Sequence, residues 1–194
     1  MRACKFTRKT KETEIDISLV IDGSGKTNIS TGVGFLDHML TLWAVHGLFD
    51  LTITASGDFH VDDHHTVEDV GICLGMAFSR AMGELKGIRR YGFQILPMEE
   101  ALAVVAVDIC NRPFFVFDVK FPTEKVGAFD TELVEEFLRA MVVNSGITLH
   151  VKVEYGKNSH HISEAVFKAL GRVMDKASLL DRRVKGVPSS KGRL

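Results

Sequence analysis

The sequence has almost no net charge and no long apolar run. Its 24 lysines and arginines nearly balance 25 aspartates and glutamates, which leaves a formal net charge of −1. That balance gives no general attraction to nucleic acid or to an anionic membrane surface, so we expect neither as a partner. No window approaches the roughly 20 apolar residues that a membrane-spanning helix requires. The polar first residues also lack the apolar core of a secretory signal, and we expect a cytoplasmic protein.

Common cysteine and histidine motifs are also missing. The three cysteines, Cys4, Cys73 and Cys110, form no Cys-x-x-Cys pair, which favours free thiols in a reducing compartment. The His-Glu-x-x-His helix of metalloproteases does not occur.

One nucleotide-binding motif is incomplete. Gly25-Lys26-Thr27 resembles the end of a P-loop, but Val20 stands where that pattern needs a glycine. We interpret these residues as a hairpin turn, after which residues 27–31 return as a second strand.

What the sequence does contain is an internal repeat. His64-His65-Thr66-Val67-Glu68 recurs as His160-His161-Ile162-Ser163-Glu164, 96 residues later and about half the chain away. Each copy follows a strand-like segment that runs to a glycine, Gly57 or Gly156, and the first copy has three extra residues in the intervening loop. Further positions match at the same offset: Val70 with Val166, Leu74 with Leu170, Gly75 with Gly171 and Ala81 with Ala177. Such self-similarity predicts two similar halves.

The spacing of apolar residues predicts the same order of elements in both halves. The first half has strands at 15–21, 27–31 and 50–56 and helices at 35–49 and 65–84. The second has strands near 92–96, 101–109, 113–119 and 148–155 and helices at 130–145 and 160–178. This order, strands–helix–strand–helix twice, predicts an α+β fold of two β-sheet/helix repeats, residues 1–92 and 93–194, with helices on one face of each sheet. No composition shift near residue 92 marks a linker, so we expect the halves to pack as one unit.

The two histidine motifs predict metal ligands. On a helix, His64 and Glu68 are four residues apart and share a face, whereas His65 is rotated by roughly 100° from His64. One motif therefore supplies a histidine and a glutamate to one ion and its second histidine to another, and two motifs provide six ligands for two ions. Imidazole and carboxylate together suit manganese, iron or zinc, and the sequence does not choose among them.

The repeat extends to one more pair of helical residues. His38 lies 26 residues before His64, and Glu136 lies 24 residues before His160, in segments that align with each other. Their matching places in the two halves add both side chains to the predicted ligand set.

Three long stretches resemble the imidazoleglycerol-phosphate dehydratase family. They are Gly34-Phe35-Leu36-Asp37-His38-Met39, Asp63-His64-His65-Thr66-Val67-Glu68-Asp69-Val70-Gly71 and Gly156-Lys157-Asn158-Ser159-His160-His161. The resemblance runs from Thr7 to the tail and is to the monofunctional form, without a fused phosphatase domain. It implies two packed β-sheet/helix repeats, trimers that assemble into a 24-subunit octahedral shell, and active sites at subunit interfaces that each hold two Mn²⁺ ions.

Through this resemblance, the ligands of two Mn²⁺ ions per subunit are His38, His64, His65, Glu68, Glu136, His160, His161 and Glu164. Many relatives have histidine where this chain has Glu136. The implied reaction converts imidazoleglycerol phosphate to imidazoleacetol phosphate and water in histidine biosynthesis. Metal binding to both ring nitrogens favours an imidazolate, which expels the neighbouring hydroxyl to give a diazafulvene-like intermediate and acidifies the adjacent C–H.

The resemblance also implies roles for other side chains. Glu12 matches the family's acid/base glutamate and joins Glu68 and Glu164 in the catalytic set. His46 and Lys168 are expected to contact the substrate, together with the metal ligands. The phosphate contacts are Arg90, Arg112, Ser189, Ser190 and Lys191, since arginine offers a planar fork and lysine a point charge.

Two other interpretations remain open from the sequence. The paired motifs alone would suit another di-metal enzyme, such as a hydrolase. They would also suit a non-enzymatic metal-binding shell protein, which would have no need of Arg90, Arg112 or the Ser-Ser-Lys tail.

Overall fold

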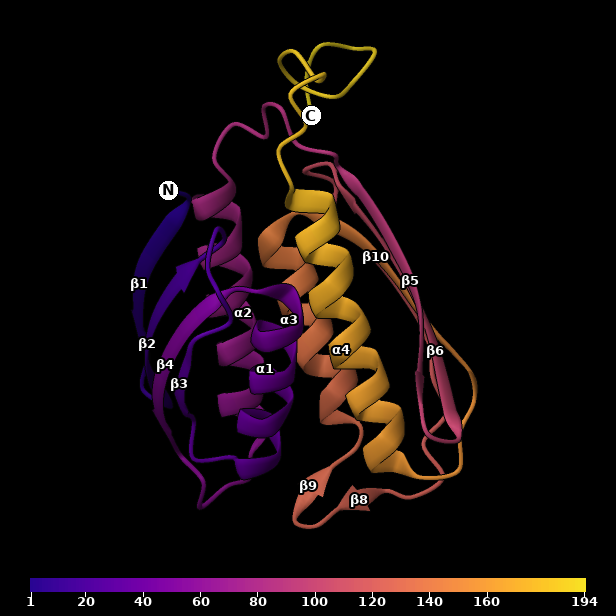
Figure 1. Ribbon diagram of the computed structural model, residues 1–194. Helices are drawn as coiled ribbons and strands as arrows, with labels where there is room; N and C mark the ends of the chain where they lie inside the picture. The colour runs from indigo at the N-terminus through magenta and orange to yellow at the C-terminus, as the bar shows by residue number, and fades with distance from the viewer.

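Each half of the chain builds one four-stranded sheet, and four helices lie between the two sheets (Figure 1). The structure is a computed structural model that describes residues 1–194. The first half comprises β1 (Ala3–Lys9), β2 (Thr13–Val20), β3 (Thr27–Ser30), α1 (Gly34–Gly47), β4 (Asp50–Gly57) and α2 (His64–Met82). The second comprises β5 (Tyr91–Met98), β6 (Ala101–Ile109), β7 (Phe114–Asp118), β8 (Lys125–Val126), β9 (Phe129–Asp130), α3 (Leu133–Ser145), β10 (Ile147–Tyr155) and α4 (Ser159–Ser178).

The first sheet has the order β1-β2-β4-β3, and this order corrects one sequence prediction. The predicted hairpin between β2 and β3 is wrong, because β2 pairs with β1 on one side and with β4 on the other. β3 instead runs parallel to β4. The carboxylate of Asp50 holds the connecting turn against β4 by accepting hydrogen bonds from the backbone N–H groups of Ser24 and Lys26. β1 was not predicted, because its residues alternate only between exposed and half-buried and none is buried.

The second sheet repeats the same topology in the order β5-β6-β10-β7, with β7 parallel to β10. The predicted α+β fold of two similar halves is therefore confirmed. The proposed division at residues 92 and 93 falls inside β5, whose first residue is Tyr91. The short β8–β9 hairpin belongs to the second half alone.

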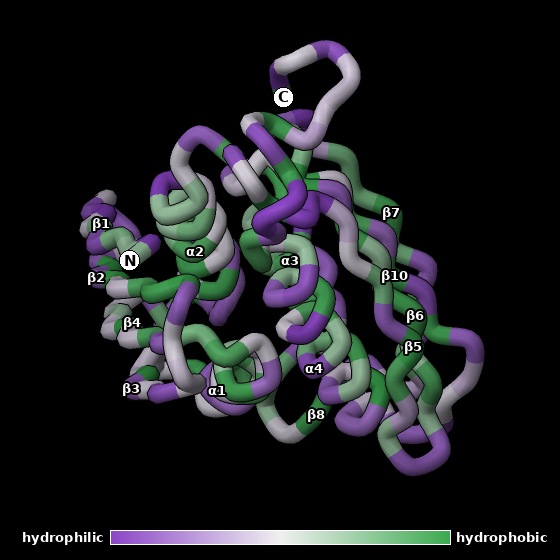
Figure 2. The backbone as a smooth tube through the Cα atoms, turned by 45° about the horizontal axis from the view of Figure 1, so that its top comes forward, coloured by the Kyte–Doolittle hydropathy of each residue, from purple (hydrophilic) through white to green (hydrophobic).

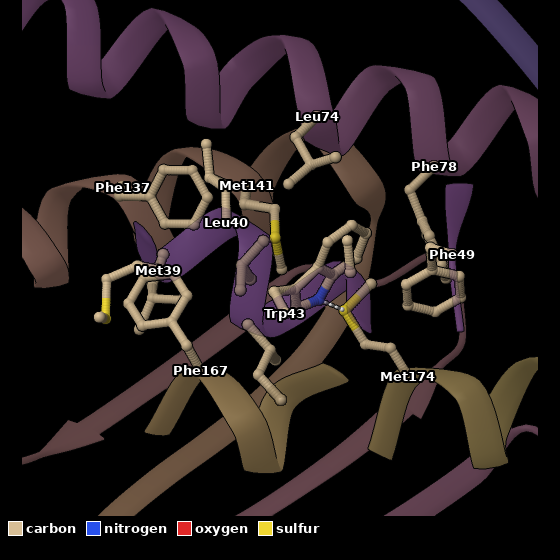
Figure 3. Close-up of a cluster of buried hydrophobic side chains, with 14 of the residues drawn as sticks. Met39, Leu40, Trp43, Phe49, Leu74, Phe78, Phe137, Met141, Phe167 and Met174 are labelled. Carbon is tan, nitrogen blue, oxygen red and sulfur yellow. Dashed lines mark hydrogen bonds between the residues drawn. The ribbon is translucent and has the colours of Figure 1, made fainter. Parts of the chain in front are cut away.

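The helices join the halves around one shared core. α2 packs against α3 and α1 against α4, so each helix pair contains one helix from each half. A continuous cluster of 44 buried residues runs through the molecule, which explains why the halves pack as one unit. Figure 3 shows its centre, where the indole Nε1 of Trp43 lies 3.3 Å from the Sδ of Met174.

Repeated glycines allow the helix pairs to approach closely. A Cβ atom on Gly75 of α2 would lie 2.5 Å from the carbonyl oxygen of Met141 in α3. A Cβ atom on Gly171, the matching residue in α4, would lie 2.3 Å from the carbonyl oxygen of Trp43 in α1. Only a residue without a side chain permits such backbone contact, and this contact sets the spacing of the helices.

All four helices begin at the same end of the molecule, the lower end in Figure 1. The C-terminal tail lies beyond the opposite end, and Figure 2 shows it as mostly hydrophilic or neutral. None of the helices has both the length and the apolar character needed to cross a membrane.

Candidate active site

Three predicted ligands converge where α1 meets α4. The Nε2 atom of His38 lies 2.8 Å from Oε1 of Glu164, and Nε2 of His160 lies 3.2 Å from the same oxygen. The three ligand atoms all lie within 4.8 Å of one another. His160 and Glu164 share one face of α4, as their spacing of four residues requires.

The charge on Glu164 is strongly stabilised. Burial alone would raise the pKa of this carboxyl, but the ammonium of Lys168 and hydrogen bonds from the two histidines outweigh it and bring the pKa to about 2. The Nζ atom of Lys168 lies 2.7 Å from Oε2 of Glu164 and leaves Oε1 to the histidines. Glu164 is therefore ionised at neutral pH, as a metal ligand must be.

This donor set fits a divalent transition metal. Two imidazole nitrogens and one carboxylate oxygen face a common point, and this mixture of donors suits manganese, iron or zinc. Three protein ligands would leave coordination positions on such an ion for other groups.

The matching residues of the first half are more widely spaced. Nε2 of His64 lies 3.9 Å from Oε2 of Glu68, and Glu136 does not complete a three-ligand cluster with them. His38 can donate a hydrogen bond to Glu164, whereas Glu136, its counterpart in the repeat, is a carboxylate and has no proton to donate to Glu68 when ionised. The role of Glu136 as a ligand stays a prediction.

The second histidine of each pair has a carboxylate partner that the sequence analysis missed. Nδ1 of His65 lies 3.0 Å from Oδ2 of Asp58, and Nδ1 of His161 lies 2.7 Å from Oε2 of Glu100. These hydrogen bonds raise the pKa of both histidines, and the bond from His161 lowers the pKa of Glu100 to about 2. No spacing in the sequence links either carboxylate to its histidine, because both contacts arise from loop packing.

Glu12 lies at the same end of the molecule. It directly precedes β2 and is exposed, and its charge contributes to the raised pKa of His65. His46 lies further along α1, where burial lowers its pKa and the cations Arg172 and Lys168 lower it further. The imidazole of His46 is therefore neutral at neutral pH.

The predicted phosphate contacts line one cavity of about 450 Å³ at the opposite end. Its lining includes Arg90, Arg112, Ser189, Ser190 and Lys191. Arg90 is buried and forms a bidentate pair with Asp108, with Nε–Oδ1 and Nη2–Oδ2 distances of 2.6 and 3.0 Å. Its Nη1 donates to the carbonyl oxygen of Pro188 and so holds the tail in place. Asp108 was not predicted from the sequence, because its link to Arg90 depends on the pairing of β5 with β6.

The two candidate regions lie far apart within one chain. The backbone N–H of Arg90 donates to the carbonyl of Ala177 in the last turn of α4, whereas His160 lies in the first turn. At 1.5 Å per residue, the helix separates them by about 25 Å. One subunit therefore cannot present both regions to the same small molecule.

Comparisons with known proteins agree with the resemblance seen in the sequence. The sequence model of the imidazoleglycerol-phosphate dehydratase family matches residues 31–174. A protein of that name from Acetivibrio thermocellus is 60% identical over 193 residues, which cover 100% of this chain and 99% of the relative. Another, from a Geobacillus strain, is 58% identical over 194 residues, and the alignment covers 100% of both chains.

Solved structures show the same fold. The crystal structure of imidazoleglycerol-phosphate dehydratase from Staphylococcus aureus aligns with a TM-score of 0.84 at 42% identity and covers 92% of this chain and 99% of that one. The structure of the enzyme from Pyrococcus furiosus aligns with a TM-score of 0.84 at 37% identity, and the alignment covers 97% of this chain and 100% of that one.

The fold and these similarities define an enzyme that removes water from its substrate, a carbon–oxygen lyase of histidine biosynthesis. This result decides against the hydrolase and the non-enzymatic shell protein. The chain belongs to the imidazoleglycerol-phosphate dehydratase family.

Proposed function

We propose that this enzyme converts imidazoleglycerol phosphate to imidazoleacetol phosphate and water, with two Mn²⁺ ions per subunit, at sites shared between subunits of a homo-oligomer. The observation that supports it most directly is the convergence of His38, His160 and Glu164 in a chain of this family. The remaining proposed ligands lie near the starts of α2, α3 and α4 at the same end: His64, His65, Glu68, Glu136 and His161.

Each group has a role that follows from its chemistry. Two Mn²⁺ ions held by these ligands would favour the deprotonated imidazole ring of the substrate. Glu12 is exposed and makes no side-chain hydrogen bond within its own subunit, so its carboxylate is free to take the proton from the C–H beside the departing hydroxyl. Lys168 lies one turn after Glu164 in α4, and His46 lies two turns after His38 in α1. We assign both side chains to orienting the polar part of the substrate.

The cavity at the opposite end is suited to a phosphate. Arg112 is largely exposed within it, and Lys191 and the hydroxyls of Ser189 and Ser190 add further donors. Arg90 has five N–H groups, of which three have partners, so it retains donors for an anion. The three-carbon chain that joins the substrate's ring to its phosphate is far shorter than the distance between the two regions, so the ring and the phosphate must contact different subunits.

The outer face of the second sheet supports self-association. Tyr91, Phe93, Ile95 and Phe114 are each more than half exposed there. The outer face of the first sheet instead carries residues such as Lys5, Thr7, Asp16 and Thr54. An apolar sheet face of this kind marks an interface between proteins, and we assign it to contacts among subunits of the proposed trimers and 24-mer.

A direct test combines turnover with elemental analysis. Purified protein loaded with Mn²⁺ should dehydrate imidazoleglycerol phosphate, leave phosphoesters and peptides intact, and hold two Mn²⁺ ions per subunit. Replacement of His64, His65, His160 and His161 by alanine together should remove both ions. A full complement of Mn²⁺ in that variant would contradict the assigned ligands.

A further inference from the structure

The two paired histidines have the same arrangement in both halves of the molecule. The rings of His64 and His65 lie 6.4 Å apart at 84°, and those of His160 and His161 lie 6.3 Å apart at 81°. In each pair the Nδ1 atom of the second histidine meets a carboxylate. The common geometry is therefore built twice, once in each half.

The carboxylates that produce this geometry come from different places. Glu100 lies in the turn between β5 and β6, directly before β6. Asp58 lies in the loop between β4 and α2, which is three residues longer than its counterpart before α4. Two non-equivalent positions thus provide the same carboxylate contact to the second histidine. If the contact were only a remnant of the duplication, the two carboxylates would occupy equivalent positions.

The residue in the first half that corresponds to Glu100 is Glu12. Glu12 directly precedes β2, and the next residue, Thr13, lies against Gly57. Glu100 directly precedes β6, and the next residue, Ala101, lies against Gly156, the glycine that matches Gly57 in the repeat. The two glutamates therefore occupy equivalent turns but have different partners.

We propose that Asp58 and Glu100 are positioning residues that orient His65 and His161 for metal binding. Because Asp58 binds His65, Glu12, which is the counterpart of Glu100 in the first half, stays free for proton transfer. This inference rests on the proposed function, since it assigns a purpose to histidines that are proposed ligands. A carboxylate accepts hydrogen bonds only, so Nδ1 of each histidine carries the proton and the Nε2 lone pair of the neutral ring remains for a metal ion.

Glu100 is itself held in place. Its Oε1 accepts hydrogen bonds from the backbone N–H groups of Lys157 and Asn158 at 3.1 and 2.8 Å, while Oε2 faces His161. Asp58 accepts from His65 with both oxygens, at 3.2 and 3.0 Å. Each carboxylate thus restrains both the rotation and the tautomer of its histidine, which lowers the cost of ordering a ligand when metal binds.

The test is equilibrium dialysis of the assembled full-length enzyme against Mn²⁺, with elemental analysis at each concentration. Asp58→Ala and Glu100→Ala should each weaken binding of Mn²⁺ roughly 10- to 100-fold. Asp58→Asn and Glu100→Gln keep an acceptor but lose the charge, so their affinities should lie between those of the alanine variants and the wild type. If an alanine variant fails to fold, these two amide variants give the deciding comparison.

Two controls make the result specific. Glu14→Gln removes one exposed carboxylate that pairs only with Lys9, and it should bind Mn²⁺ like the wild type. Glu12→Gln changes the residue equivalent to Glu100, and it too should keep wild-type affinity for Mn²⁺. Equal weakening in Glu14→Gln, or weakening in Glu12→Gln as large as in Asp58→Ala, would overturn the inference.

The same experiment separates this inference from the proposed function. If the wild type binds two Mn²⁺ ions and the Asp58 and Glu100 variants bind them equally well, only the positioning roles are wrong. If the wild type binds no Mn²⁺, the two-ion centre is wrong and the inference fails with it.

Discussion

Complementation between two inactive variants tests whether the active site is shared between subunits. One variant, His160→Ala, is damaged at the end of the molecule where the helices begin. The other, Arg112→Ala, is damaged in the cavity about 25 Å away along α4. If each site combines the first region of one subunit with the cavity of another, a mixed oligomer contains some sites with no damaged component.

The expected recovery follows from random assembly. In an equal mixture, half of the subunits have an intact first region and half have an intact cavity. A site needs one intact first region and one intact cavity, so about one quarter of the wild-type activity should return, whether or not a third subunit adds residues that are intact in both variants. This value is well above the activity of either variant alone.

The assay needs subunit exchange before turnover is measured. The two variants are dissociated together, reassembled with Mn²⁺ and assayed for dehydration, and each variant treated alone is the control. Coassembly is checked by an affinity tag on one variant. If coassembled oligomers show no more activity than the separate variants, one subunit provides both regions and the argument from the length of α4 is wrong.

Three further predictions address proton transfer, assembly and packing. Glu12→Gln should retain Mn²⁺ and the oligomer while turnover falls by roughly two to four powers of ten, and near-normal turnover would show that another group moves the proton. Removal of Mn²⁺ with a chelator should shift the proposed 24-mer toward trimers, because a metal that binds only the assembled state stabilises it. Light scattering that still detects a 24-mer in thoroughly metal-free protein would contradict this coupling. Gly75→Ala should lower the free energy of unfolding by about 1–3 kcal/mol, since its Cβ would lie 2.5 Å from the carbonyl oxygen of Met141. Gly34→Ala, where a Cβ meets nothing within 4 Å, is the matched control and should show no such loss in a denaturant titration.

The sequence by itself determined the features that depend on local spacing. The two histidine motifs and the boundaries of α2 and α4 follow from helical periodicity and from the repeat, because residues four apart share a helix face in any tertiary context. The duplicated order of strands and helices was likewise visible, since β2 and β6 alternate buried and exposed residues. The repeat added His38 and Glu136 to the predicted ligands, whereas the proposed roles of Glu12 and of the phosphate contacts came only from the resemblance to a known family.

Only the tertiary structure decided which distant residues meet. β3 pairs with β4 instead of β2, and a polar strand, β1, takes the other edge, because pairing partners depend on the whole sheet and not on the periodicity of one strand. Asp58, Glu100 and Asp108 became recognisable when loops and neighbouring strands brought them to their partners. The separation of the metal-ligand and phosphate regions also came from the fold, because the direction and length of α4 place them at opposite ends of the subunit.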